Sequence, residues 1–149
     1  MKALVQRVVQ ASVSVNGEVV GSIGKGIVVF LGVGRGDTRE DADYLAQKLA
    51  GLRVFQRGEA EFDLSVLDVR GAVLAVSQFT LMADTRKGRR PSFIEAAPPG
   101  EALPLYERFV ESLVERGVSV QTGTFQQYMQ VAIHNDGPVT VLLDSRIRK

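Results

Sequence analysis

The sequence predicts an α+β fold of about eight strands in mainly antiparallel pairing, with two helices packed on one side. Three observations support this prediction. Residues 3–15 alternate between apolar and polar side chains, as a half-buried antiparallel strand does. Asn16-Gly17 follows, which is the residue pair that two-residue hairpin turns prefer. Two later segments, 42–52 and 103–116, carry apolar side chains at helical spacing.

The remaining elements are shorter apolar runs separated by turns. Asp37 and Glu40 form a capping-box variant before the first helix, and Gly117 is placed to end the second. Residues 83–100 form a long connection rich in Arg, Pro and Gly, and such loops are more often functional than filler. The strands expected after the hairpin turn are 18–23, 27–31, 53–56, 62–69, 72–80, 118–120, 125–133 and 139–143.

One residue breaks the alternation of the first strand. Arg7 shares the parity of the apolar side chains Val5 and Val9. A charge directed toward a core is costly unless it is paired. Either a bulge turns Arg7 away, or its guanidinium reaches a specific partner such as a backbone carbonyl or another chain.

Length and composition are those of a globular protein, and we expect one domain over residues 1–149. The chain is 45% hydrophobic and 23% charged, and no apolar stretch approaches the ~20 residues of a membrane span. Its N-terminus lacks the apolar core of a signal peptide. The absence of Cys excludes disulfides and thiolate metal sites and is compatible with the cytoplasm, and the single His134 argues against a His-rich metal site. We therefore expect no metal and no cofactor.

The charge is small overall but unevenly distributed. The net charge is +1, which gives no general signal for polyanion binding. Two local clusters stand out: residues 146–149 at the C-terminus, and the loop cations Arg86, Lys87, Arg89 and Arg90. Such clusters on a nearly neutral domain favour a phosphate-binding patch. The alternative is a solvated loop and a solvated tail.

Ser77-Gln78-Phe79-Thr80 places polar side chains at the end of a buried strand. Strand alternation sends Gln78 and Thr80 to the same side, where they could share the floor of a pocket. Thr80 is a possible nucleophile, but no nearby residue supplies a base to activate it. Gln78 and the backbone amides of Phe79 and Thr80 could stabilise a developing oxyanion. The alternative is a hydrogen-bonded cluster without chemistry.

Gly137-Pro138-Val139-Thr140 is the second unusual segment. An X-Pro bond in a turn is ordinarily trans, and a cis bond occurs in only ~5–6% of folded cases. A cis bond would aim the Gly137 and Pro138 carbonyls in the same general direction and so create a pair of acceptors. His134, which precedes this segment on an apolar strand, is interpreted as a structural or surface residue.

Together the two segments resemble the D-aminoacyl-tRNA deacylase family. The resemblance implies an esterase that removes a D-amino acid, or glycine mischarged on tRNA(Ala), from the 3′ end of tRNA as translation quality control. It also implies a cytoplasmic homodimer with a barrel-like β architecture and active sites at the subunit interface. The similarity covers nearly the whole chain, in segments 6–8, 11–13, 24–26, 31–33, 53–55, 76–81, 90–93, 121–123, 129–131 and 135–140.

The resemblance also assigns roles to residues. Ser77, Gln78, Phe79 and Thr80 match the catalytic motif. Gly137, Pro138, Val139 and Thr140 match a motif that the partner subunit inserts with a cis bond, and whose carbonyls exclude an L side chain. The terminal ribose 2′-hydroxyl of tRNA would assist the attack, which explains a site without a base. Arg7 would brace the partner's Gly-Pro segment, and Met129 would line the adenosine or aminoacyl pocket.

Two regions depart from the commoner pattern of this family, namely residues 61–66 and the basic tail 144–149. Both lie outside the two motifs, so they bear on tRNA contacts rather than on chemistry. The alternative functions are a nucleic-acid-binding module without catalysis, suggested by the basic loop, and a general hydrolase of small esters.

Overall fold

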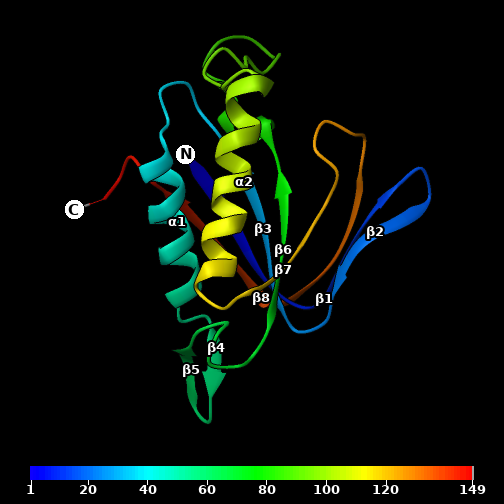
Figure 1. Cartoon of the computed structure of the whole chain (residues 1–149), viewed down its shortest axis with the longest axis vertical. Coiled ribbons are helices and arrows are strands. Elements are labelled where there is room, and N and C mark those ends of the chain that lie inside the picture. Colours follow the sequence, from blue (N-terminus) through cyan, green and yellow to red (C-terminus); the bar gives the residue numbers. More distant parts are fainter. Residues whose placement is uncertain (149) are drawn as a thin grey trace.

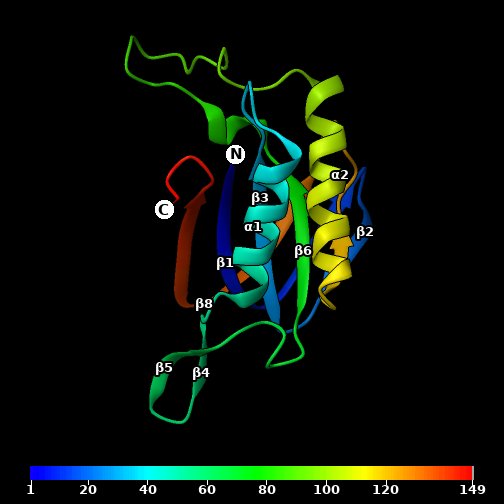
Figure 2. The same ribbon diagram turned by 60° about the vertical axis from the view of Figure 1, so that its left-hand side comes forward.

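A computed structural model describes residues 1–148 and shows a strongly curled, barrel-like sheet with two helices on one face. The main sheet has the order β2-β1-β3-β6-β7, and β8 pairs with the other side of β1. The bounds of the main-sheet strands are β1 Lys2–Val15, β2 Glu18–Ile23, β3 Gly26–Gly32, β6 Ala72–Ser77, β7 Ser119–Thr122 and β8 Gln130–Asp144. The helices α1 (Arg39–Gly51) and α2 (Pro99–Glu115) lie side by side against this sheet (Figure 2).

The pairing is mainly antiparallel, as predicted. β1 is antiparallel to β2, β3 and β8, whereas β6 runs parallel to both β3 and β7. A separate antiparallel hairpin, β4 (Phe55–Arg57) and β5 (Ala60–Leu64), projects from the end of the molecule that α1 reaches with its last turn (Figure 1). The hairpin strands are shorter than the predicted segments 53–56 and 62–69, because residues 65–71 turn back toward β6.

A bulge in β1 displaces Val9 from its predicted buried position, whereas Ala11 and Val13 in the second half of the strand are buried as predicted. The register with β8 shifts between Gln6 and Val8 and again between Val8 and Gln10. Val8 is therefore buried, while Val9, which we expected to face the core, is 53% exposed. A bulge adds a residue on one strand and reverses the faces until a second irregularity restores them. Arg7 lies within this irregularity, and its guanidinium also has specific partners, so both explanations of its position hold.

The curled sheet covers two apolar clusters, one on each of its faces. The larger cluster lies beneath α1 and α2 and includes Ile27, Leu31, Leu45, Phe109 and Leu113. The smaller one lies on the opposite face, where the second half of β1 folds over β3 and β6; its buried members are Val8, Ala11, Val13, Ile23, Val28, Leu74 and Val76. β3 and β6 contribute side chains to both clusters. Their odd-numbered and even-numbered positions are therefore both apolar.

The helix ends differ from the predicted ones. The N-cap of α1 is Thr38, whose partner in the capping box is Asp41, so the predicted pair Asp37 and Glu40 was wrong by one position. α2 begins at Pro99, four residues before the predicted start, because Pro suits the first helical position, which needs no amide hydrogen. Gly117, with φ of +90°, follows the end of α2 as predicted.

Two strand predictions also needed correction near the site. β6 ends at Ser77 rather than at residue 80, and residues 79–82 form a 3₁₀ turn, η1 (Phe79–Met82). β8 is one continuous strand from Gln130 to Asp144 rather than two segments, and residues 125–129 form the loop before it. The hairpin at Asn16-Gly17 is confirmed, with φ of +51° and +81° at the two residues.

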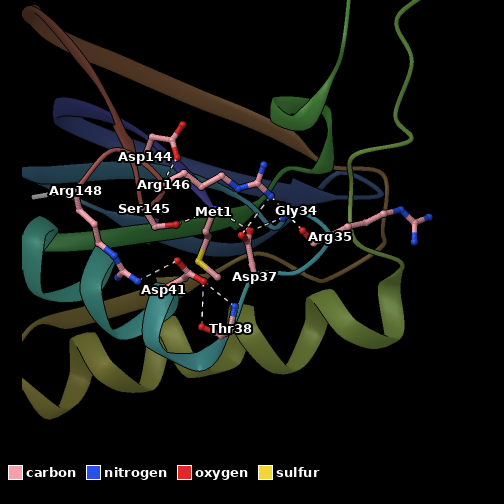
Figure 3. Close-up of polar contacts among 10 residues, drawn as sticks. All are labelled: Met1, Gly34, Arg35, Asp37, Thr38, Asp41, Asp144, Ser145, Arg146 and Arg148. Carbon is pink, nitrogen blue, oxygen red and sulfur yellow. Dashed lines mark hydrogen bonds and ion pairs between the residues drawn. The ribbon is translucent and has the colours of Figure 1, made fainter.

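The N-terminal ammonium is buried and forms an ion pair (Figure 3). Met1 is fully buried, and its nitrogen lies 2.7 Å from Asp37 Oδ2 and donates to Ser145 Oγ at 3.0 Å. The same Asp37 oxygen accepts a hydrogen bond from the Gly34 amide. Ser145 N in turn donates to the Met1 carbonyl at 2.9 Å. The carboxylate that we expected to cap α1 therefore joins the start of β1, the turn after β3 and the end of β8.

Neither helix within residues 1–148 is long and apolar enough to span a membrane.

Candidate active site

A cavity of about 580 Å³ opens where β6 ends. One wall is the segment from Ser77 to Thr80, and the loop before β8 supplies the opposite wall with Gln126, Gln127 and Met129. The remaining lining is apolar and aromatic, contributed by Phe30, Val33, Val76, Phe93, Ala96, Ala97, Pro98, Pro99, Ala102, Phe125 and Val131. The structure thus gathers five of the predicted site residues, Ser77, Gln78, Phe79, Thr80 and Met129, into one cavity.

The turn η1 shapes the polar wall. Gln78 N donates to the Leu31 carbonyl at 2.8 Å, which continues the β3–β6 ladder by one residue. The chain then turns, and the Gln78 carbonyl accepts from Leu81 N at 3.3 Å. The first amides of a helical turn have no partner inside it, and in residues 1–148 those of Phe79 and Thr80 make no hydrogen bond to another turn or loop. These two amides are free to bind an anionic oxygen.

The side chains of Gln78 and Thr80 are in direct contact. Gln78 Nε2 donates to Thr80 Oγ1. Strand alternation had placed them on one side, but the contact arises from the 3₁₀ turn instead, since the strand has already ended at Ser77. No titratable side chain within residues 1–148 lines this cavity, so Thr80 has no general base beside it. The polar groups available here are hydroxyls, carboxamides and backbone amides.

An aromatic pair stands at the rim of the polar wall. The rings of Phe79 and Phe93 meet edge to face, with centroids 5.0 Å apart and an interplanar angle of 69°. Phe79 is nevertheless 57% exposed, and Ile94, which follows Phe93 in the sequence, is 73% exposed. Arg35 anchors this loop by donating from its Nε to the Ile94 carbonyl. The rim therefore presents apolar surface that is open to a ligand.

The Gly137-Pro138 bond is cis, as the family resemblance implies. Both residues are exposed. Gly137 has φ of +122°, and a Cβ there would lie 3.0 Å from Arg7 Nη2, so only glycine fits. Thr140 Oγ1 accepts hydrogen bonds from the side chains of Gln6 and Asn135, and Asn135 Oδ1 accepts from Val139 N.

Arg7 holds this turn within its own chain. Its Nε donates to the Asp136 carbonyl at 3.1 Å and lies 3.3 Å from Asp136 Oδ2. Its Nη1 donates to the Val54 carbonyl at 2.8 Å. The Arg7 side chain is only 14% exposed, so it fixes Asp136 and the adjoining Gly137 to the middle of β1.

The two motifs lie at opposite ends of the sheet. Ser77 pairs with Leu31 near the end of β3, whereas Arg7, which binds the Gly-Pro turn, pairs with Ile27 near its start. Four residues along a strand correspond to roughly 13 Å. The cavity lining includes none of Arg7, Gly137, Pro138, Val139 and Thr140. One chain alone therefore does not bring the motifs together.

The basic loop is exposed and only partly neutralised. The Arg86 guanidinium donates two hydrogen bonds to Asp84, and the Arg86 amide donates a third. These bonds lower the pKa of Asp84 to about 2, so that this carboxylate stays charged and Arg86 stays paired. Lys87, Arg89 and Arg90 are exposed, and none lies within ion-pair distance of a carboxylate in the described part of the chain. None of the four cations lines the cavity.

Sequence reasoning identified Met129 on the opposite wall of the cavity but missed the other residues there. Gln126 and Gln127 lie in what we predicted to be a strand, and Ala96, Ala97 and Ala102 were not singled out within or beside the long loop 83–100. The available signal was the run Ala96-Ala97-Pro98-Pro99, whose small side chains leave space beside Phe79 and Phe93. His134, in contrast, lies outside the cavity as expected; it is exposed and contacts Gln10 on β1.

Comparison with known proteins identifies one class of relatives over nearly the whole chain. Relatives named D-aminoacyl-tRNA deacylase occur in Fervidobacterium nodosum, 56% identical over 98% of both chains, and in Dehalococcoides mccartyi, 59% identical over 99% of this chain and 97% of the relative. A solved structure titled c-Myc DNA Unwinding Element Binding Protein is 43% identical, covers 97% of this chain and 98% of its own, and superposes with a TM-score of 0.91.

The family model described as D-Tyr-tRNA(Tyr) deacylase matches residues 4–144. The chain belongs to this family. A structure titled as a probable eukaryotic D-amino acid tRNA deacylase shares the fold at 20% identity, with a TM-score of 0.81 over 95% of this chain and 97% of its own.

Proposed function

We propose that this chain hydrolyses the ester bond of D-aminoacyl-tRNA, releases the free D-amino acid and the tRNA, and leaves L-aminoacyl-tRNA largely intact. The activity follows from the family to which the chain belongs. The observation that carries the proposal in this structure is the cavity at the end of β6, where Ser77, Gln78, Phe79 and Thr80 line one wall. Glycine mischarged on tRNA(Ala) is the second proposed aminoacyl group, because it has no side chain to exclude.

The chemistry that we infer uses hydrogen-bond donors rather than a protein nucleophile. Water, assisted by the terminal ribose 2′-hydroxyl of tRNA, attacks the ester carbonyl, and the bond to the ribose oxygen breaks. The Phe79 and Thr80 amides and the Gln78 carboxamide stabilise the oxyanion that forms. Gln78 is oriented for this role by its hydrogen bond to Thr80 Oγ1. Thr80 then acts by positioning Gln78, and Met129 lines the pocket beside the substrate.

We infer that the chain works as a homodimer whose cavities are completed across the interface. Support comes from the separation of the motifs: Gly137 and Pro138 are exposed and lie roughly 13 Å or more from the site in their own chain. A second copy would supply the Gly137–Thr140 turn to this cavity, with Arg7 and Asp136 holding the turn in place. The turn would then exclude an L side chain by backbone contact, and it would not distinguish one D side chain from another.

The tRNA is expected to be held in part by the basic loop. Lys87, Arg89 and Arg90 are the exposed cations of this loop for which no paired carboxylate is found in the described chain, and they follow the cavity wall in sequence. Cations in this position neutralise phosphates and make binding salt-dependent. Since Asp84 already pairs with Arg86, we expect the other three to dominate this effect. A soluble tRNA substrate is consistent with action in the cytoplasm.

The proposal is tested by a side-by-side deacylation assay on matched D-, L- and glycyl-tRNA. We expect release of the D-amino acid and of glycine, with L-aminoacyl-tRNA cleaved at least ~100-fold more slowly, the discrimination that about 3 kcal/mol of steric rejection provides. Equal turnover of the D- and L-aminoacyl-tRNA would contradict the proposed exclusion of L side chains by the Gly137–Thr140 turn. Small free esters serve as the control: rapid hydrolysis of these would favour a general esterase.

Replacing Thr80 distinguishes positioning from covalent catalysis. Because nothing beside Thr80 accepts its proton, we expect Thr80→Ala to lose only about threefold to tenfold in kcat, the effect of one supporting hydrogen bond. Gln78→Ala, which removes an oxyanion donor, is expected to lose ~10²-fold or more. A Thr80→Ala variant as inactive as Gln78→Ala, together with a burst of released tRNA in the wild type, would instead identify Thr80 as the nucleophile.

A second candidate is nucleic-acid binding without catalysis. The basic loop supports it, and one similar solved structure is titled as a DNA-binding protein. Binding through phosphates alone weakens steeply with salt and has no preference for the aminoacyl group. The same assay separates the two functions, because a binding module would leave all three charged tRNAs intact.

A further inference from the structure

The loop before β8 contains an unusual backbone conformation inside the cavity. Three residues other than glycine have a φ in the left-handed region within residues 1–148: Asn16 at +51°, Arg70 at +53° and Gln126 at +64°. Asn16 and Arg70 lie in turns away from the cavity, whereas Gln126 lines it. Long side chains rarely adopt this conformation, and such residues concentrate where a site needs a particular side-chain direction.

Gln126 has a free carboxamide. A hydrogen bond from Gln127 N to the Thr124 carbonyl at 3.2 Å closes the turn around it. In the described part of the chain its own side chain makes no hydrogen bond, unlike Gln78 on the opposite wall, which is bound to Thr80. The turn therefore fixes the Gln126 backbone and leaves both its donor and its acceptor available to a ligand.

The surroundings of Gln126 suit a nucleobase. Phe125 precedes it, and Phe79 and Phe93 line the same cavity, so flat apolar surfaces lie near the Gln126 carboxamide. Aromatic side chains stack on bases, and a Gln carboxamide can pair with adenine through one donor and one acceptor. The terminal nucleoside of tRNA is adenosine. If the ester occupies the wall of Ser77 to Thr80, the part of the cavity lined by Gln126 is available to its adenine.

We propose that Gln126 binds the terminal adenine of the tRNA by its carboxamide and thereby positions the ester against Gln78 and the Phe79 and Thr80 amides. This inference rests on the proposed active site. It concerns binding of the tRNA end, and it makes Gln126 a determinant of KM rather than of the chemical step.

The test replaces Gln126 with glycine, which accepts the left-handed φ and removes only the side chain. We expect Gln126→Gly to raise KM for D-aminoacyl-tRNA roughly threefold to tenfold, the effect of one lost hydrogen bond, with kcat nearly unchanged. The melting temperature should not fall, because glycine relieves the backbone. Arg70→Gly is the matched control: the same relief outside the cavity should leave KM unchanged. An unchanged KM in Gln126→Gly would overturn the proposal.

A second substrate identifies the group that Gln126 binds. Purine riboside in place of the terminal adenosine lacks the exocyclic amine, so the wild type should show the same rise in KM, and Gln126→Gly should show no further rise. Equal additional losses in both proteins would show that the carboxamide does not bind the base and would overturn the proposal. Gln78→Ala distinguishes failure of the proposed active site from failure of the adenine contact. If Gln78→Ala retains full activity, the proposed active site is wrong. If Gln78→Ala is impaired but Gln126→Gly has an unchanged KM, only the role of Gln126 is wrong.

Discussion

Mixing two inactive variants of the chain is expected to restore about a quarter of the wild-type activity. Gln78→Ala damages the cavity wall, and Pro138→Ala damages the exposed turn that we assign to the partner's cavity. In a freely exchanging equal mixture, about half of the dimers contain one of each, and one of their two sites is free of both substitutions. The expected gain is large because Gln78→Ala lacks an oxyanion donor and Pro138→Ala disturbs the turn that completes the neighbouring cavity, so each variant alone should have little activity.

Deacylation of D-aminoacyl-tRNA by the mixture, measured after subunit exchange, checks this prediction. Mixing Gln78→Ala with Gln78→Glu is the matched control, since two defects in the same wall cannot compensate for each other. Mass spectrometry of the intact assembly would verify that mixed dimers have formed. Mixed dimers without recovered activity would mean that the turn does not complete the neighbouring site, whatever the oligomeric state.

Replacing Asp37 is expected to cause the largest loss of stability among the polar substitutions discussed. Asp37 is 3% exposed, and its partner, the fully buried ammonium of Met1, lies 2.7 Å away. Asp37→Asn keeps an acceptor for the Gly34 amide but removes the charge that compensates the ammonium. Removing one partner of a buried ion pair typically costs about 3–5 kcal/mol, because the other charge stays buried without compensation.

Urea denaturation at neutral pH measures the change in the free energy of unfolding. Asp63→Asn is a suitable control, because Asp63 pairs with Arg57 on the surface, where side-chain exposures are 33% and 69%; its loss should stay below about 1 kcal/mol. Ser145→Ala, which removes one hydrogen bond from the ammonium, should fall between the two at about 1 kcal/mol. A loss in Asp37→Asn no greater than in Asp63→Asn would contradict the role of the ion pair.

Features with a local cause could be predicted from the sequence. The first half of β1 and the hairpin turn depend on alternation and on Asn16-Gly17, and both are found in the structure. Val9 could not be placed correctly, because the bulge depends on the register with β8, more than a hundred residues away. Asp37 was misassigned for the same reason: its partner is the ammonium of Met1, not the helix that follows it.

The site was predictable in one half only. Polar residues directly after a buried apolar strand identified Ser77 to Thr80, and the strand indeed ends there. Gln126 carries no comparable signal, because its φ depends on how residues 124–129 turn toward β8. The separation of the two motifs was equally hidden, since it follows from which residues of β3 pair with Arg7 and with Ser77.

The buried ammonium also determines at which end of the chain an affinity tag can be attached without disturbing the fold. An affinity tag fused before Met1, or acylation of its nitrogen, would convert the cation into a neutral amide and bring extra atoms into a fully buried position beside Asp37. Preparations modified at this nitrogen would report the stability of a disturbed molecule. Fusion at the opposite end of the chain leaves the contact between Met1 and Asp37 intact, and measurements of folding and activity are best made on that form.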